Sequence, residues 1–215
     1  MIEKIGLIIG SPKGKDSISF SYAMLLKEYL SKENIEYKLF FAYNDLINNQ
    51  DIEEISICSR LILIFPLYVD AIPSKLIEYM KSIEISLKNT IKNIKVYSVV
   101  NCGFPESFHN KIALNMIEIF SKKADLLWRF GIGIGEGTFF NEFTKRSPSL
   151  KFLLIKRIIP IVDNIIDDKD KTQENMYFDL PILNFIFIFI AHKHWINIAK
   201  KNKLQKYQLK EQPSF

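Results

Sequence analysis

The sequence predicts an α/β fold in which helices cover both faces of a parallel sheet of five strands. Three observations lead to this prediction. Short apolar runs rich in β-branched residues alternate along the chain with longer segments of helical spacing. The apolar runs are nearly continuous, which is typical of strands buried on both faces of a parallel sheet. A length of 215 residues, 48% of them hydrophobic, suits one domain with a sizeable core.

The expected strands and helices follow one another in order along the chain. The strands are the apolar runs 5–9, 37–41, 61–65, 96–100 and, more weakly, 126–132. The helices repeat apolar residues every three or four positions, at 17–30, 74–87 and 111–120. A doubly wound sheet of this kind takes the strand order 2-1-3-4-5.

The second half of the chain suggests a boundary and an extension. The polar run 167–174 is typical of a connector, and one long helix is expected beyond it, over 180–201. We therefore divide the chain into a sheet domain, 1–170, and a C-terminal helical extension, 171–215. The extension is expected to pack on the sheet domain or on a second copy of the chain.

Composition and charge exclude several classes of function. The net charge is +5, but the lysines are scattered and form no basic stripe with interleaved aromatics, so nucleic-acid binding is not expected. Cys58 and Cys102 form neither a CxxC pair nor a disulfide framework, which is typical of the reducing cytoplasm. The most apolar run, 181–191, is too short to span a bilayer, and no targeting segment is evident. His192 and His194 point to different sides of a helix, so no metal site is expected.

The first expected strand is followed by a turn, 10–19, with two glycines, one proline, two lysines and three serines. It matches neither a Walker A loop, a GxGxxG fingerprint nor a nucleophile elbow. A strand end, a turn and a helix start direct unpaired backbone N–H groups and the positive end of the helix dipole to one point, where a phosphate can bind. An ordinary turn capped by Asp16 or Ser17 explains these residues equally well.

Two further loops favour the phosphate hypothesis. The segments 64–76 and 99–106 place proline, aromatic and small residues at the ends of the third and fourth expected strands. Ligands of open α/β sheets bind in the crevice at the carboxyl ends of the strands. One loop would supply anion-binding groups, and the other two would supply flat apolar surfaces with backbone amides. A planar ring with a phosphate tail, such as FMN, fits this combination.

The chain resembles the flavodoxin-like NAD(P)H-dependent FMN reductase family over nearly its whole length, on the motifs GSPKGKDSIS, PLYVDAIPSKL, NCGFPE and the C-terminal AHKHWINIAKKNKL. The resemblance implies a flavodoxin-like fold, non-covalently bound FMN, NAD(P)H as reductant and a homodimer. It also implies three sets of FMN contacts. They are, for the phosphate, Ser11, Lys13, Ser17 and Ser19; for the isoalloxazine, Pro66, Leu67, Tyr68 and Val69; and for its pyrimidine side, Asn101, Cys102, Gly103 and Phe104.

Three features remain open at this point. Relatives often have Arg at position 13 and Asn near position 17, and this chain departs from that pattern with an acidic Asp16. We expect the Asp16 side chain to point outward as a helix cap, because it would repel a phosphate. Cys102 could be a nucleophile partnered by His109, although we favour a small residue packing under a flavin. The glycine-rich run 131–137 either admits a closely approaching loop or subunit or leaves room for a ring.

The loops and the resemblance together predict an FMN-dependent oxidoreductase. It would transfer hydride from NAD(P)H to FMN and then reduce a small-molecule acceptor, such as a flavin, a quinone, a nitro compound or a metal ion. No catalytic side chain is assigned, because the flavin carries the hydride step. The alternatives are a one-electron carrier of the flavodoxin type and a flavin-free regulatory or interaction module on the same fold. Such carriers are typically strongly acidic, so the positive net charge favours the reductase.

Overall fold

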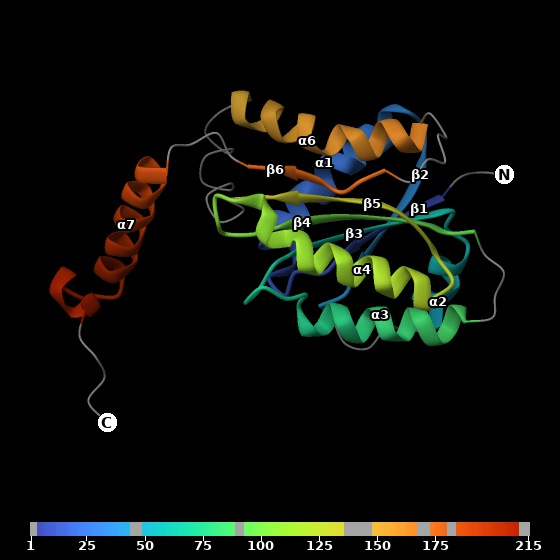
Figure 1. Cartoon of the computed structure of the whole chain (residues 1–215), viewed down its shortest axis with the longest axis horizontal. Coiled ribbons are helices and arrows are strands. Elements are labelled where there is room, and N and C mark those ends of the chain that lie inside the picture. Colours follow the sequence, from blue (N-terminus) through green and yellow to red (C-terminus); the bar gives the residue numbers. More distant parts are fainter. Residues whose placement is uncertain are drawn as a thin grey trace. The chain divides into compact units, whose positions relative to one another are not determined.

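The computed structural model describes residues 4–43, 49–88, 93–135, 148–166, 173–179 and 184–210. Its centre is a six-stranded sheet in the order β2-β1-β3-β4-β5-β6, and every pairing is parallel (Figure 1). The strands are β1 (Lys4–Ile9), β2 (Glu36–Phe41), β3 (Arg60–Pro66), β4 (Lys95–Asn101), β5 (Leu127–Ile134) and β6 (Met176–Phe178). The helices are α1 (Ile18–Lys32), α2 (Asn49–Ser56), α3 (Ser74–Leu87), α4 (Lys111–Lys123), α6 (Pro148–Ile166) and α7 (Asn184–Lys201), with short 3-10 helices η1 (Gly14–Asp16), η2 (Ser107–Asn110) and η3 (Lys206–Lys210).

The predicted α/β class is confirmed, but the predicted number of strands is wrong. Each expected strand is present with both ends within two residues of the prediction, and β6 adds a sixth strand beside β5. This strand lies in the segment 171–215 that the sequence assigns to the extension. It is only three residues long and half-buried, so it carries neither a long apolar run nor an alternating pattern. Its pairing partners, Ile132 to Ile134, are distant in the sequence.

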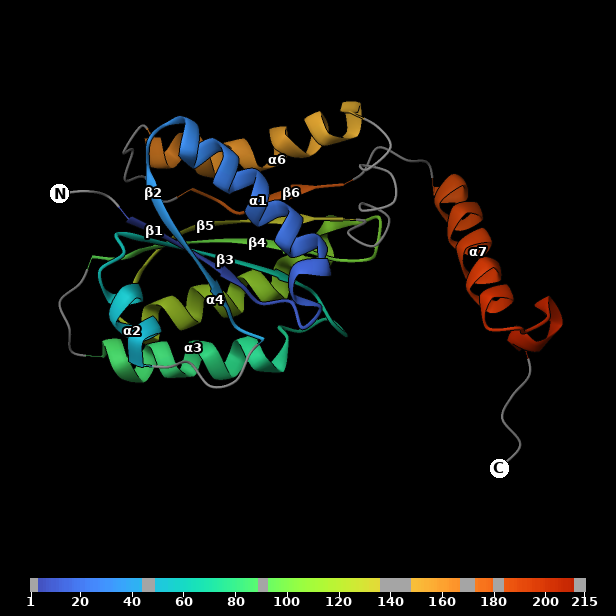
Figure 2. The same cartoon turned by 180° about the vertical axis from the view of Figure 1, so that it is seen from behind.

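The sheet is buried on both faces. Helices α1 and α6 cover one face, and α2, α3 and α4 cover the other (Figures 1 and 2). Because side chains alternate along a strand, Leu7 and Ile9 of β1 pack toward α1 and α6, whereas Ile8 packs in the core under α3 and α4. This two-sided burial explains why the central strands are continuous apolar runs.

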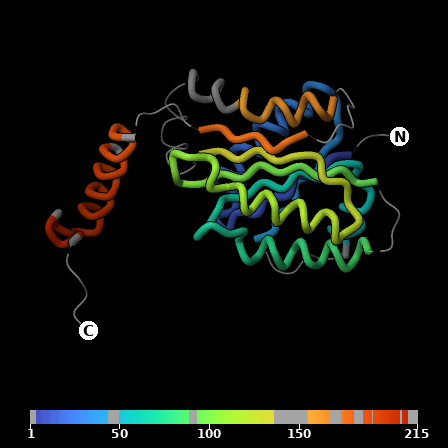
Figure 3. The backbone as a smooth tube through the Cα atoms, in the orientation of Figure 1, coloured from blue at the N-terminus to red at the C-terminus, as the bar shows by residue number. Residues whose placement is uncertain are grey.

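The strand order opens a crevice beside β1. The chain passes from β1 to β2 on one side and then returns to β3 on the other side. The helices that follow β1 and β3 lie on opposite faces of the sheet, so the loops leading to them diverge. Ligands bind at such a switch point. The tube in Figure 3 shows the backbone leaving the sheet at the same end after β3 and after β4.

Residues 181–215 form a separate compact unit that contains α7 and η3. Helix α7 exposes large apolar side chains, among them Phe185, Ile188, Phe189 and Trp195. Among the described helices, none combines the length and the apolar character needed to cross a membrane.

Candidate functional site

The loops after β1, β3 and β4 enclose a cavity of about 170 Å³ at the carboxyl edge of the sheet. Most of the expected FMN contacts line it: Ser11, Lys13, Ser17, Ser19, Pro66, Leu67, Tyr68, Asn101 and Gly103. Three others, Val69, Cys102 and Phe104, are not among the lining residues. Asp16 and Ile18 line the cavity as well.

Asn101 connects the three loops. Its backbone carbonyl accepts a 2.7 Å hydrogen bond from the N–H of Leu67 in the loop after β3. Its side-chain Oδ1 accepts a 3.0 Å hydrogen bond from the hydroxyl of Ser19 at the start of α1. Both Ser19 and Asn101 are buried. The walls of the cavity are therefore joined by direct hydrogen bonds through one residue.

The loop after β1 turns sharply at Gly14, whose φ is +55°. The turn is closed by a hydrogen bond from Gly14 N–H to Ser11 O, at 3.0 Å. A Cβ atom at this position would lie 2.7 Å from Cζ of Tyr43, so the ring of Tyr43 packs directly against the backbone. The left-handed backbone favours glycine here, and a side chain would also have to displace the ring of Tyr43.

Ser17, and not Asp16, caps helix α1. The Ser17 Oγ accepts a 3.0 Å hydrogen bond from the N–H of Phe20 and donates a 2.6 Å hydrogen bond to Gly14 O. The expectation that Asp16 would be the cap is wrong, although Asp16 is exposed as expected. Ser17 has the extended backbone of an N-cap, whereas Asp16 lies in η1 and lines the cavity. The Ser17 hydroxyl proton is thus already engaged within the turn.

Donor groups remain free at the polar end of the cavity. The backbone N–H groups of Ile18 and Ser19 lie in the first turn of α1, where a helix supplies no acceptors, and no acceptor for them occurs among the described residues. Within the same part of the chain, the Ser11 hydroxyl accepts from Lys13 N–H at 3.3 Å and donates to no group. The Lys13 side chain adds a positive charge, and Asp16 opposes it. These donors suit an anion.

The loop after β3 forms a two-residue hairpin beside this polar end. Tyr68 and Ala71 exchange both backbone hydrogen bonds, each at 3.0 Å. The two residues between them have positive φ, 49° at Val69 and 55° at Asp70. Pro66, Leu67 and Tyr68 line the cavity before the hairpin tip, so they provide it with an apolar wall.

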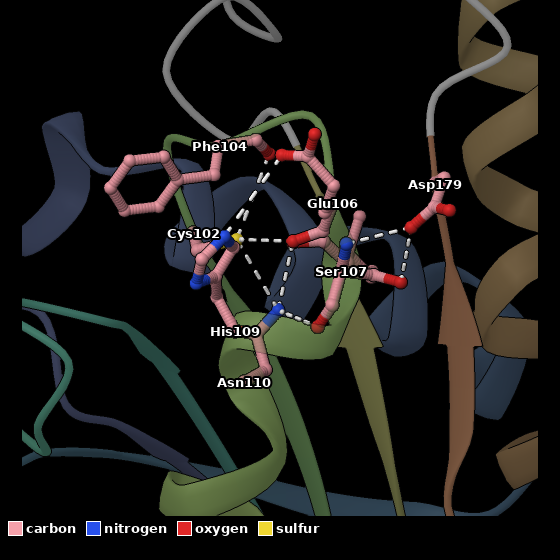
Figure 4. A network of polar contacts seen from close by, with 8 residues as sticks. Cys102, Phe104, Glu106, Ser107, His109, Asn110 and Asp179 are labelled. Carbon is pink, nitrogen blue, oxygen red and sulfur yellow. Dashed lines mark hydrogen bonds and ion pairs between the residues drawn. The ribbon is translucent and has the colours of Figure 1, made fainter.

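Cys102 lies beneath the loop after β4 (Figure 4). Its side chain is buried, and the thiol donates to the backbone oxygens of Phe104 and Glu106, at 3.7 and 3.6 Å. The ring of His109 lies on Phe104, with ring centroids 4.4 Å apart. The thiol therefore holds the loop from inside, and this geometry favours neither a nucleophile nor a surface under a flavin.

The same loop is tied to the end of β6, a contact that the sequence does not reveal. The carboxylate of Asp179 accepts hydrogen bonds from the backbone N–H and the hydroxyl of Ser107, at 2.7 and 2.5 Å (Figure 4). Arg157 of α6 donates to Asp179 O at 2.8 Å. The hydrogen bonds from Ser107, with the nearby charge of Arg157, lower the pKa of the Asp179 carboxyl from its ordinary value.

Asp179→Asn is expected to lower the free energy of unfolding at neutral pH by about 1–2 kcal/mol, a value reduced for the exposure of the carboxylate to solvent. Because the folded-state pKa is lowered, the stabilisation is complete above the unfolded-state value near 3.8 and is lost as the pH falls through the folded-state value. Denaturation at pH 7 and at stepwise lower pH should show the two proteins converging below about pH 4. Asp125→Asn, at an exposed turn, is the control.

Two glycines of β5, Gly131 and Gly133, and Gly135 directly after the strand alternate along the chain, and the structure shows why they lack side chains. A Cβ at Gly135 would lie 2.2 Å from the backbone oxygen of Pro105, and one at Gly131 would lie 2.3 Å from Leu114. At Gly133 it would approach Ser107 O at 3.2 Å. Of the two interpretations of this run, the close approach of a loop therefore holds at Gly133 and Gly135, whereas a side chain of α4 fills the space beside Gly131. Residues 136 and 137 lie outside the described part of the chain.

The described residues contain no group of three or more His, Cys, Asp or Glu side chains that could hold a metal ion. Comparison by sequence gives no family: no protein-family model matches the chain, and no curated protein matches it significantly.

Solved structures do resemble the chain. An NAD(P)H:quinone oxidoreductase from Methanothermobacter marburgensis aligns with 77% of this chain and 100% of its own, at 12% identity and a TM-score of 0.55. The apo form of an NADH:FMN oxidoreductase aligns with 73% of this chain and 86% of its own, at 14% identity and a TM-score of 0.55. An azoreductase from Bacillus anthracis aligns with 75% of this chain and 99% of its own, at 11% identity and a TM-score of 0.53. The chain therefore has the flavodoxin-like fold of these structures.

Proposed function

We propose that this protein is an FMN-dependent oxidoreductase that takes hydride from NAD(P)H and reduces a small-molecule acceptor. The observation that carries the proposal is the cavity at the switch point of the sheet, where free donors at the start of α1 lie next to an apolar wall. The names of the structural neighbours, a quinone oxidoreductase, an FMN oxidoreductase and an azoreductase, support the same class of reaction.

The chemical groups that line the cavity suit each part of FMN, its phosphate, its ring and the pyrimidine edge of that ring. Its phosphate would accept hydrogen bonds from the N–H groups of Ile18 and Ser19 and from the Ser11 hydroxyl, with Lys13 nearby. Its ring would lie against the wall formed by Pro66, Leu67 and Tyr68. In the described part of the chain Gly103 N–H has no acceptor, so it would donate to the pyrimidine edge. Cys102 and Phe104 would act indirectly, by shaping the loop that carries Gly103.

The chemical step places few demands on the protein. When bound, FMN supplies the hydride acceptor. The N–H of Gly103 would stabilise negative charge at the pyrimidine edge, because a fixed donor there needs no reorganisation during the reaction. Leu67 and Pro66 would exclude water from one side of the ring, and Tyr68 would bound the space where a second ring stacks. No acid or base side chain is needed.

Titration of the purified protein with FMN, followed by visible absorption, tests the cofactor. We expect a shifted flavin spectrum and saturable binding, and then rapid bleaching when the complex is mixed anaerobically with NADH or with NADPH. A chain that leaves the FMN spectrum unchanged would contradict both flavin hypotheses. If FMN binds but neither nucleotide bleaches it, while one-electron titration accumulates a half-reduced flavin, the electron-carrier alternative is correct.

We also propose that the protein is a homodimer that uses helix α7. The exposed side chains of Phe185, Ile188 and Phe189 form an apolar surface that a second copy would cover. Phe189→Asp is expected to give monomers in size-exclusion chromatography with light scattering, because it places a charge in that contact. Asn197→Asp, at an exposed polar position of the same helix, should leave the assembly unchanged. An unmodified protein that is monomeric at every concentration would disprove the idea.

A further inference from the structure

The tip of the hairpin after β3 is strained. Val69 and Asp70 are the two central residues of the turn, and both have left-handed φ values, 49° and 55°. Gly, Asn and Asp are favoured in such turns, whereas a β-branched side chain is disfavoured there. The Val69 side chain is also 99% exposed. Within this chain it therefore raises the energy of the backbone and buries almost no apolar surface in return.

The rest of the hairpin imposes this conformation. On one leg, Leu67 N–H is held by Asn101 O at 2.7 Å, and Tyr68 is paired with Ala71. On the other leg, the Ile72 side chain is buried in the core under α3. Both legs are thus fixed, and the two-residue tip cannot relax without breaking one of these contacts. Strain held in place by its surroundings concentrates at sites that contact ligands.

The tip directly follows a residue that lines the cavity. Tyr68 lines the cavity, is 39% exposed, and is followed directly by Val69. On the neighbouring loop, Gly103 lines the cavity and is followed by Phe104, which is 51% exposed. In each loop, the residue directly after the lining residue is therefore an exposed apolar one. The nearby exposed groups Asp70 and Glu106 are carboxylates.

We propose that Val69 is a specificity-determining residue that contacts the electron acceptor, and that the acceptor it favours is a planar, uncharged ring. The inference rests on the proposed function, because it needs a second reactant at the flavin. The apolar tip would cover one edge of that ring with Tyr68 beneath it. The carboxylate of Asp70 would disfavour acceptors that carry a negative charge. The strain is then the cost of presenting the side chain outward.

The test compares three variants on FMN-loaded protein. Val69→Asn is close in size and tolerates the left-handed backbone, so it removes the strain and the apolar surface together. Val69→Ile keeps both. Ile85→Asn, an exposed position of α3, controls for any change of an apolar surface residue. The probes are a neutral naphthoquinone and the same naphthoquinone carrying a sulfonate, with FMN affinity, KM and Tm measured for each variant.

Val69→Asn should raise Tm by about 2–4 °C through release of strain. It should raise KM for the neutral quinone roughly fivefold to tenfold, change KM for the sulfonate by less than about twofold, and leave FMN affinity within about twofold. Val69→Ile and Ile85→Asn should keep the original KM values.

Other results would overturn the inference. If Val69→Asn binds FMN and its KM for the neutral quinone is unchanged, the role of Val69 is disproved but the proposed function is not. A change of oligomeric state in Val69→Asn would also disprove that role, because it would assign the tip to a contact between copies of the chain. An unmodified chain that does not bind FMN would overturn the proposed function and this inference with it.

Discussion

Replacing Gly135 by alanine is expected to lower the free energy of unfolding by about 1–3 kcal/mol and to weaken FMN binding. The new Cβ would lie 2.2 Å from the oxygen and 2.9 Å from the carbon of the Pro105 carbonyl. These are backbone atoms, and Gly135 is itself held by its N–H donating to Phe178 O at 3.1 Å. The loop after β4 would have to move, and with it Gly103. Chemical denaturation and FMN titration measure the two effects.

Gly131→Ala is the matched control, since it adds the same methyl group in the same glycine-rich run, within β5. The atom nearest to the added methyl group is Cδ2 of Leu114, at the far end of a flexible side chain. We expect a smaller loss of stability and an unchanged affinity for FMN. Equal losses of FMN affinity in both variants would show that the Pro105 contact does not position the site.

Ser11→Ala is expected to weaken FMN at least tenfold while riboflavin affinity stays nearly unchanged. A hydrogen bond to a charged acceptor contributes about 1.5–3 kcal/mol, and the Ser11 proton is free to make one, because within the described chain this hydroxyl only accepts. Ser17→Ala is the weaker test. Its hydroxyl already caps α1, so its removal would cost about 1 kcal/mol of stability as well.

Asp16→Asn is expected to change the affinity for FMN in the opposite direction at the same site. Removing the carboxylate from the cavity wall should strengthen FMN binding roughly fivefold at low salt, less at high salt, and should not affect riboflavin. Glu33→Gln, an exposed carboxylate at the far end of α1, is the control. Parallel changes for FMN and riboflavin would place the phosphate elsewhere.

The central strands could be predicted because burial on both faces makes each an unbroken apolar run. Edge strand β6 could not, since it is three residues long and half-buried. No helix is predicted over α6, although Ile158, Ile161, Val162 and Ile165 are buried at helical spacing. Pro160 interrupts that pattern, because proline is disfavoured inside helices.

The positions of the three loops were predictable from the sequence, but their internal bonding was not. A loop after a parallel strand must leave at the carboxyl edge, which is why Ser11, Tyr68 and Gly103 line one cavity. The choice between Asp16 and Ser17 as cap depends on the backbone angles of one turn. The contact of Ser107 with Asp179 joins residues far apart in the chain, and no local pattern records it.

The hydrogen bonds of Asn101 have a kinetic consequence. Because the bonds of Ser19 and Leu67 to Asn101 are made within the chain itself, we expect the three loops to lose their freedom during folding and not on binding. The ligand then binds to a preformed site, and its association needs no slow rearrangement of the loops. In rapid mixing, the observed rate should increase linearly with flavin concentration instead of levelling off, and differences in affinity between flavins should arise mainly in how fast they dissociate.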